Sequence, residues 1–225
     1  MSSTLFIHHS QFDQHSVPPS HPESPLRNLA VETKLRQTGL WQDLTIQTCE
    51  MVNPNTFKEV HTEGYIDQLY RIAPPKGMIL ADADTPLMFN TLKATEEAAG
   101  SGIQAVKQVL SGEYKNAFCA IRPPGHHAEK QKAMGFCVYN NIAVGAYYLL
   151  EKYKLNKVAI IDFDVHHGNG TQDIFYDNEK VLYISSHQYP YYPGSGAANE
   201  KGKKDNVLNV PLSAGTQTHE FLNAY

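Results

Sequence analysis

Two short polar clusters with adjacent histidines each follow an apolar run in this sequence. They are Arg122-Pro-Pro-Gly-His-His-Ala128 and Asp162-Phe-Asp-Val-His-His-Gly-Asn169. Aspartate oxygen and imidazole nitrogen are ordinary ligands of Zn²⁺, and histidine is a natural general acid and base near neutral pH. Because a buried carboxylate needs a compensating partner, a strand that ends in this much polar chemistry predicts a bound divalent metal.

The second cluster offers two metal ligands. Alternation along an extended strand puts Asp162, Asp164 and His166 on one side. Asp164 and His166 are therefore the candidate ligands, and Asp162, which lies further back, is suited to fixing the tautomer of a nearby imidazole. The alternative is a structural strand end, in which these aspartates and histidines only hydrogen-bond to one another.

The first cluster places His126 and His127 after a Pro-Pro-Gly turn. A single histidine is more often a structural residue than a catalyst, and that interpretation stays open. Two adjacent imidazoles beside a metal-bound water can activate the water and protonate a leaving amine. The pair therefore favours catalysis.

The elements that must position these clusters alternate between strands and helices. Apolar runs predict strands at 4–7, 41–48, 117–121, 158–163 (a buried strand), 181–185 and 207–210. Helical periodicity and end signals, including Ser24 as N-cap before Pro25, predict helices at 25–37, 62–72, 92–110, 141–153 and from residue 219, with a loop at 73–86. This alternation predicts an α/β fold, a single domain with a mostly parallel sheet flanked by helices. Both histidine pairs and the tyrosine-rich loop 188–196 then follow the carboxyl ends of strands, where open α/β sheets bind ligands.

Composition narrows the class of protein. The chain has 225 residues, 41% of them hydrophobic, and a net charge of −4, which suits one α/β domain and no direct nucleic-acid partner. The cysteines, Cys49, Cys119 and Cys137, show no C-x-x-C spacing, so we expect no disulfide framework and a cytoplasmic protein. With no signal peptide and no apolar run of about 20 residues, we expect no membrane partner.

The spaced set of motifs resembles the histone deacetylase superfamily, specifically its class II-like and bacterial amidohydrolase members and the related acetylpolyamine amidohydrolases. The matching motifs occur in the family's order: His21-Pro-Glu-Ser-Pro25 with Arg27, Arg122 to Ala128, Gly135-Phe-Cys137, Asp162 to Gln172, and Tyr192-Pro-Gly-Ser-Gly196. The resemblance implies the arginase/deacetylase fold, with residues 1–225 forming the N-terminal two-thirds of such a domain.

The resemblance also implies roles for individual residues. Asp164 and His166 match zinc ligands, with Fe²⁺ as an alternative metal. His126 and His127 match the catalytic pair, of which His127 resembles the general base and acid. Asp162 matches the carboxylate behind His126, and Asn169 stands behind His127. The walls of a narrow channel for an acylated lysine-like chain match Gly135, Phe136 and Tyr192. Arg27 matches an arginine in an inner cavity behind the metal.

Members of this family also bind monovalent cations, often K⁺. One matching site would use Asp162, Ser185, Ser186 and the backbones of Asp164 and His166. A second would use carbonyls near Phe175, Asn178 and Val181. Ordinary loop backbone is the alternative for both groups.

The family's third zinc ligand, a later Asp, and its transition-state Tyr belong to segments that this sequence does not contain. Zinc sites need at least three protein ligands as a rule. We therefore expect a C-terminally truncated chain, an incomplete form of a longer enzyme. The alternatives are that the missing ligands come from another chain, or that the product is not an active hydrolase.

The expected function is that of a zinc-dependent deacetylase, which hydrolyses the amide of acetyl-lysine in a protein or peptide to acetate and a free amine. A first alternative is an amidohydrolase of acetylated polyamines or other small amides. A second is an arginase-type ureohydrolase, which is disfavoured because Gly168 stands where those enzymes place a further metal-binding Asp. A third is a catalytically inactive module that binds acetylated partners. The oligomeric state stays open.

Overall fold

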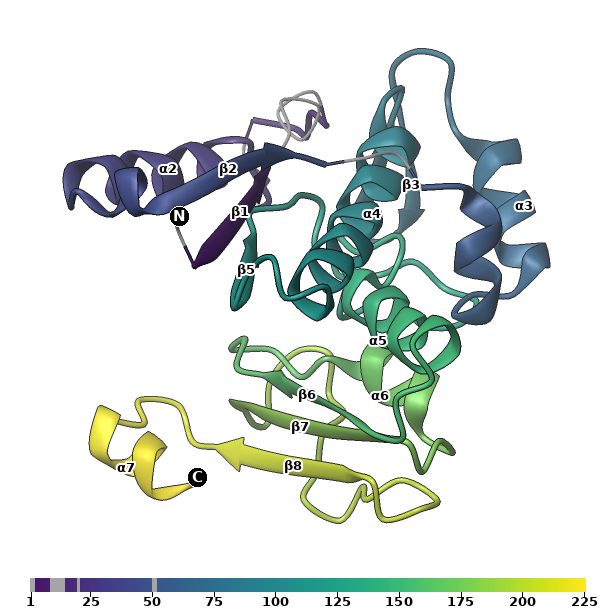
Figure 1. Cartoon of the computed structure of the whole chain (residues 1–225). Coiled ribbons are helices and arrows are strands. Elements are labelled where there is room, and N and C mark those ends of the chain that lie inside the picture. Colours follow the sequence, from purple (N-terminus) through teal and green to yellow (C-terminus); the bar gives the residue numbers. More distant parts are fainter. Residues whose placement is uncertain (1–2, 9–14, 20, 50–51) are drawn as a thin grey trace.

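The computed structural model describes residues 3–8, 15–19, 21–49 and 52–225 of the chain (Figure 1). Within these residues two parallel sheets have three strands each. The first sheet has the order β2 (Leu44–Thr48), β1 (Thr4–His8), β5 (Asn116–Cys119), and the second has the order β6 (Val158–Asp162), β7 (Val181–Gln188), β8 (Val207–Leu212). Helices lie between most successive strands along the chain, so the predicted α/β fold with parallel strands flanked by helices is confirmed.

Two long helices join the sheets. Helix α4 (Thr91–Leu110) packs against β1 and β5, and α5 (Asn141–Lys152) packs against α4 and against β6 (Figure 1). The Asn140 side chain caps α5 by accepting a hydrogen bond from the Ala143 amide, as expected of an Asn at this position. Helix α3 (Glu63–Ile72) is capped in the same way by Thr62.

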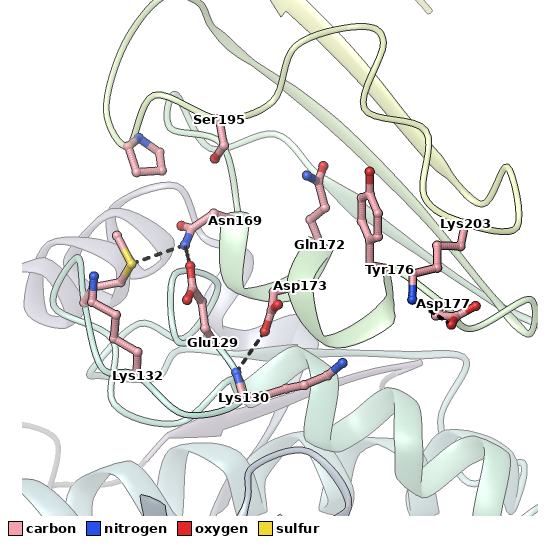
Figure 2. Close-up of a pocket in the computed structure, with 12 residues that line it drawn as sticks. Glu129, Lys130, Lys132, Asn169, Gln172, Asp173, Tyr176, Asp177, Ser195 and Lys203 are labelled. Carbon is pink, nitrogen blue, oxygen red and sulfur yellow. Dashed lines mark hydrogen bonds and ion pairs between the residues drawn. The ribbon is translucent and has the colours of Figure 1, made fainter.

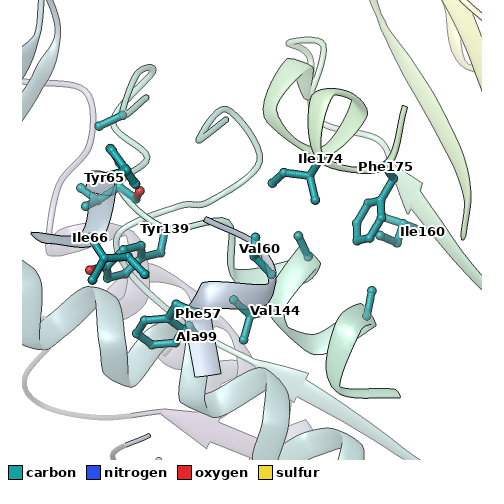
Figure 3. Close-up of a cluster of buried hydrophobic side chains, with 14 of the residues drawn as sticks. Phe57, Val60, Tyr65, Ile66, Ala99, Tyr139, Val144, Ile160, Ile174 and Phe175 are labelled. Carbon is teal, nitrogen blue, oxygen red and sulfur yellow. The ribbon is translucent and has the colours of Figure 1, made fainter. Parts of the chain in front are cut away.

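The main hydrophobic core lies where these helices meet the second sheet. Figure 3 shows aromatic and aliphatic side chains of this cluster, which come from helices and strands along most of the chain. Phe57 comes from the short 3-10 helix η2 (Pro54–Glu59), and Phe175 comes from α6 (Asn169–Phe175); both are fully buried. The sequence did not predict α6, because its Gly-Asn-Gly start has the composition of a turn.

The loop predicted at 73–86 is wrong. This segment contains most of an antiparallel hairpin, β3 (Met78–Asp82) and β4 (Thr85–Met88), which turns at Ala83 and Asp84. Leu87 of the hairpin is completely buried. Asp82 ends β3, and Asp84 lies in the turn that follows it.

Two further predictions needed correction in the first half of the chain. The strand predicted at 41–48 begins only at Leu44, because a 3-10 turn, η1 (Leu40–Asp43), follows Gly39 in its left-handed conformation. Helix α2 (Leu26–Gln37) begins one residue later than expected, with Pro25 in place of Ser24 at the N-cap. The chain closes with a short helix, α7 (Thr218–Asn223).

The seam between the two sheets exposes apolar side chains. No strand among the described residues pairs with the second edge of β5 or of β6. The strand predicted at 158–163 forms as β6, but the expectation that it is buried is wrong: Ile161 is 58% exposed and Phe163, just past β6, is 77% exposed. In the part of the chain that the structure describes, no helix combines the length and apolar character that a membrane crossing requires.

Candidate active site

The two histidine clusters meet across the seam between the sheets. His126 lies in the loop after β5, and Asp162 is the last residue of β6. Nδ1 of His126 lies 2.9 Å from Oδ2 of Asp162, and the rings of His126 and His127 have centroids 4.0 Å apart. Residues separated by more than 30 positions in the sequence are thus joined by a direct hydrogen bond.

A cavity of about 820 Å³ opens at this meeting point. Nine of the residues that the sequence singled out line it: Arg27, His126, His127, Gly135, Phe136, Asp162, Asp164, His166 and Tyr192. Asn169 lies behind His127, outside this cavity. Of the remaining residues, Ser185, Ser186, Phe175, Asn178 and Val181 do not line it.

His126 and Asp162 form a strongly coupled pair. Burial opposes the charged form of His126, but the hydrogen bond and the charge of Asp162 outweigh it and raise the pKa of His126 above its ordinary value. Burial alone would raise the pKa of Asp162; hydrogen bonds from His126, the Asp164 amide and the Tyr183 hydroxyl hold it below its usual range. The pair therefore favours an imidazolium held by a carboxylate.

His127 has the opposite tendency. Burial and the neighbouring His126 lower the pKa of His127 to about 3, although a hydrogen bond with Asn169 works against that shift. Nδ1 of His127 lies 2.8 Å from Oδ1 of Asn169. Two adjacent imidazoles are thus pushed in opposite directions, one toward carrying a proton and the other toward a neutral ring that can accept one.

Asp164 and His166 supply donor atoms of the type that zinc prefers. Nδ1 of His166 lies 3.1 Å from Oδ1 of Asp164, and the same carboxylate oxygen accepts the backbone amide of His166. The Tyr191 ring stacks on the His166 ring at 5.1 Å. Within the described ranges, no group of three or more His, Cys, Asp and Glu side chains is arranged to hold a metal ion. The carboxylate oxygen of Asp164 and the imidazole nitrogen of His166 fit two of the ligands of a zinc site.

The wall of the cavity is held by the unpredicted hairpin. Asp84 accepts the amide of Gly135 at 3.0 Å, and the Thr85 hydroxyl accepts the amide of Phe136 at 3.1 Å. Gly135 has a φ of +57°, and a Cβ atom there would collide with the imidazole of His127. Tyr192 closes the other side, with its ring edge-on to His127 at 5.2 Å.

The residues proposed for monovalent cations form two separate groups. Ser185 pairs in register with Asp162, and Ser186 accepts a hydrogen bond from Tyr225. The carbonyl oxygens of Phe175, Asn178 and Val181 converge, but each lies within 3.2 Å of the Asn206 amide nitrogen, which donates to that position.

A buried ion pair holds the N-terminal loop against the site. Arg122, which begins the first histidine cluster, donates to both carboxylate oxygens of Glu23 at 2.6 Å and to the backbone oxygen of His15. All three residues are almost completely buried. This pair fixes the loop that leads to His126.

Two residues at the site were not found from the sequence. The Tyr183 hydroxyl lies 3.0 Å from Asp162 and 3.1 Å from the carbonyl of Gly168. Glu129 accepts a hydrogen bond from the Asn169 amide at 2.7 Å. Its position directly after His-His-Ala was a usable signal; Tyr183 offered none, because its contact depends on the pairing of β6 with β7.

The chain matches the sequence profile of the histone deacetylase domain over residues 21–225. It is 38% identical over 224 residues to an Archaeoglobus fulgidus protein named "Probable deacetylase", covering 97% of this chain and 62% of that protein. It is 37% identical over 215 residues to human histone deacetylase 9, covering 81% of this chain and 21% of that protein.

A solved structure shows the same architecture. The crystal structure of the HDA15 HD domain superposes with a TM-score of 0.86 at 35% sequence identity, over 95% of this chain and 63% of that one. The chain thus spans less than two thirds of the archaeal protein and of the solved domain.

Proposed function

Because this chain belongs to the histone deacetylase family, we propose that it supplies most of the active site of a zinc-dependent deacetylase. The reaction would hydrolyse the amide of an acetylated amine to acetate and the free amine. Family membership confirms the resemblance on which the sequence interpretation rests. It supports the activity as a proposal, because the chain covers only part of its relatives.

The observation that carries the proposal is the unequal pair of imidazoles beside two metal-type donors. His126 is held by Asp162 and shifted toward its charged form, whereas His127 is shifted toward its neutral form. Both rings line the cavity that also contains Asp164 and His166. Hydrolysis of an amide needs one group that accepts the proton of water and one that gives a proton to the leaving nitrogen.

Asp164 and His166 would hold a zinc ion, which supplies polarisation of the amide carbonyl and acidification of water when it is bound. The neutral ring of His127 would accept a proton from the attacking water through Nε2. An imidazolium in the pair, stabilised by Asp162, would protonate the leaving amine. The rings of Phe136 and Tyr192 would line the path of the acylated chain and exclude bulk water.

Acetyl-lysine in a protein or peptide is the substrate that we propose first, and an acetylated polyamine is the alternative. Asp84 lies at the cavity wall, where a carboxylate can attract a cationic or amide-bearing substrate. We also propose K⁺ at the first cation group, formed by Asp162, Ser185, Ser186 and the backbones of Asp164 and His166; at the second group the Asn206 amide nitrogen already donates to the three carbonyls. Comparing turnover of an acetyl-lysine peptide with that of an acetylated polyamine would rank the two substrates.

The test uses this chain and a longer form of the protein, side by side. Zinc content is measured by metal analysis, and turnover with an acetyl-lysine peptide. Asp164→Ala should lose both metal and turnover, whereas His127→Ala should lose turnover and keep the metal. His219→Ala, at an exposed position, is the matched control. Normal turnover in either of the first two variants would overturn the proposal.

A further inference from the structure

A third residue stands behind His127 in a line of hydrogen bonds that leads away from the active-site cavity. Nδ1 of His127 lies 2.8 Å from Oδ1 of Asn169, and Nδ2 of Asn169 lies 2.7 Å from Oε1 of Glu129. Figure 2 shows the Glu129 side chain pointing at the Asn169 amide, with the hydrogen bond between them as a dashed line. Sulfur of Met134 also lies 3.2 Å from the same amide nitrogen.

The carboxylate of Glu129, at the end of this row of hydrogen bonds, determines which group donates and which accepts in each of them. A carboxylate only accepts hydrogen bonds, so the NH₂ group of Asn169 must face Glu129 and the amide oxygen must face His127. That oxygen also only accepts, so Nδ1 of His127 must carry the hydrogen. The neutral ring then has its lone pair on Nε2, the nitrogen that must take a proton from water.

An asparagine alone does not specify this arrangement. Its oxygen and nitrogen have nearly the same shape, and a rotated amide would donate to Nδ1 of His127. The hydrogen of the neutral ring would then sit on Nε2, and His127 could not act as a base. At His126 the corresponding partner is the carboxylate of Asp162, which can only accept and needs no third residue.

We propose that Glu129 is a positioning residue that selects the Nδ1–H tautomer of His127 by orienting the Asn169 amide. The catalytic consequence rests on the proposed function, but the tautomer itself does not. Glu129 lines a separate cavity of about 540 Å³ on the far side of Asn169 and is partly exposed. A lysine placed at this position can therefore reach solvent.

The experiment observes the histidine ring nitrogens by ¹⁵N NMR in this chain, which requires no turnover. The unchanged chain should show His127 with hydrogen on Nδ1. Glu129→Gln should give a mixture of the two tautomers, because the glutamine oxygen can still accept from Asn169 but its NH₂ group can equally donate to a rotated amide. Glu129→Lys offers only donors, so the Asn169 amide should rotate and the hydrogen of His127 should move to Nε2.

A compensating variant separates this effect from simple damage to the fold. In the double variant Glu129→Lys, Asn169→Asp, a carboxylate faces His127 directly and the new lysine can pair with it. The Nδ1–H tautomer should return. The same charge reversal at an exposed site, Glu113→Lys, should leave His127 unchanged.

Activity of the longer enzyme gives the second readout. Glu129→Lys should lower kcat by roughly a hundredfold or more, the usual contribution of a general base, and Glu129→Gln should recover part of the loss. An Nε2–H tautomer in the unchanged chain, or an Nδ1–H tautomer in Glu129→Lys, would refute the proposal. If the tautomers are as expected but the enzyme has no deacetylase activity, the role of Glu129 is supported and the proposed function is refuted.

Discussion

Acid pH should destabilise this fold through His61, which the structure holds neutral. His61 is 1% exposed, and both ring nitrogens are used: Nδ1 donates to the carbonyl of Glu129, and Nε2 accepts the amide of Asn140, each at 2.9 Å. A second ring proton would point Nε2–H at the Asn140 N–H. Burial is the main cause that lowers the pKa of His61 to about 4 from its ordinary 6.5.

The sign follows from the two states. The unfolded chain takes up a proton on His61 as the pH falls through about 6.5, whereas the folded chain resists until about 4. The stabilisation is complete above the unfolded value and is lost as the pH falls between these two values. About pH 5 lies roughly 1.5 units below the pKa of His61 in the unfolded chain, so protonation of the unfolded state alone lowers the free energy of unfolding by about 2 kcal/mol there.

The assay is urea unfolding of the unchanged chain and of His61→Gln at about pH 7.5 and about pH 5. The variant should be destabilised at the higher pH, and that deficit should shrink by about 2 kcal/mol at the lower pH, because the ring that resists protonation is gone. His219→Gln, at an exposed position, controls for the loss of an imidazole. An equal deficit at both pH values would show that His61 is not held neutral.

Two further variants test contacts around the site. Arg122→Met should destabilise the chain by about 3–5 kcal/mol in urea unfolding, because it leaves Glu23 buried without the guanidinium of Arg122. Replacing both Arg122 and Glu23 with apolar residues should recover most of the lost stability. If the double variant is as unstable as Arg122→Met, the buried carboxylate is not the cause. Gly135→Ala should lower turnover of an acetyl-lysine peptide by displacing His127. Gly77 also has a positive φ but has open space around it, so Gly77→Ala should reduce stability by only roughly 1–2 kcal/mol and leave turnover unchanged. Equal turnover in these two variants would show that the collision with the imidazole is unimportant.

The sequence predicted the residues of the candidate site and the succession of strands along the chain, but not which strands lie at the edges of the sheets. His126, His127, Asp164 and His166 stood out because polar residues at strand ends need a reason to be there. The exposure of Ile161 and Phe163 could not be predicted, because an apolar β-branched run looks the same in a central strand and at the edge of a sheet.

The hairpin and the polar partners of the site were missed for a different reason. The contact of Asp84 with Gly135 was not predicted, since nothing in the neighbourhood of Asp84 along the chain shows that its carboxylate will hold the Gly135 amide. The contacts of Tyr183 and Glu129 likewise join segments distant in sequence. Local patterns predict elements, whereas such contacts depend on how the elements pack.

The residues of the candidate active site come from both sides of the seam between the two sheets. His126 and His127 follow β5 of the first sheet, whereas Asp162 ends β6 of the second sheet and Asp164 and His166 follow it, so the distances between the two groups depend on how the two sheets are packed. Because α4 packs on β1 and β5, and α5 packs on β6, the contact between α4 and α5 helps to set how the two halves of the site are placed relative to each other.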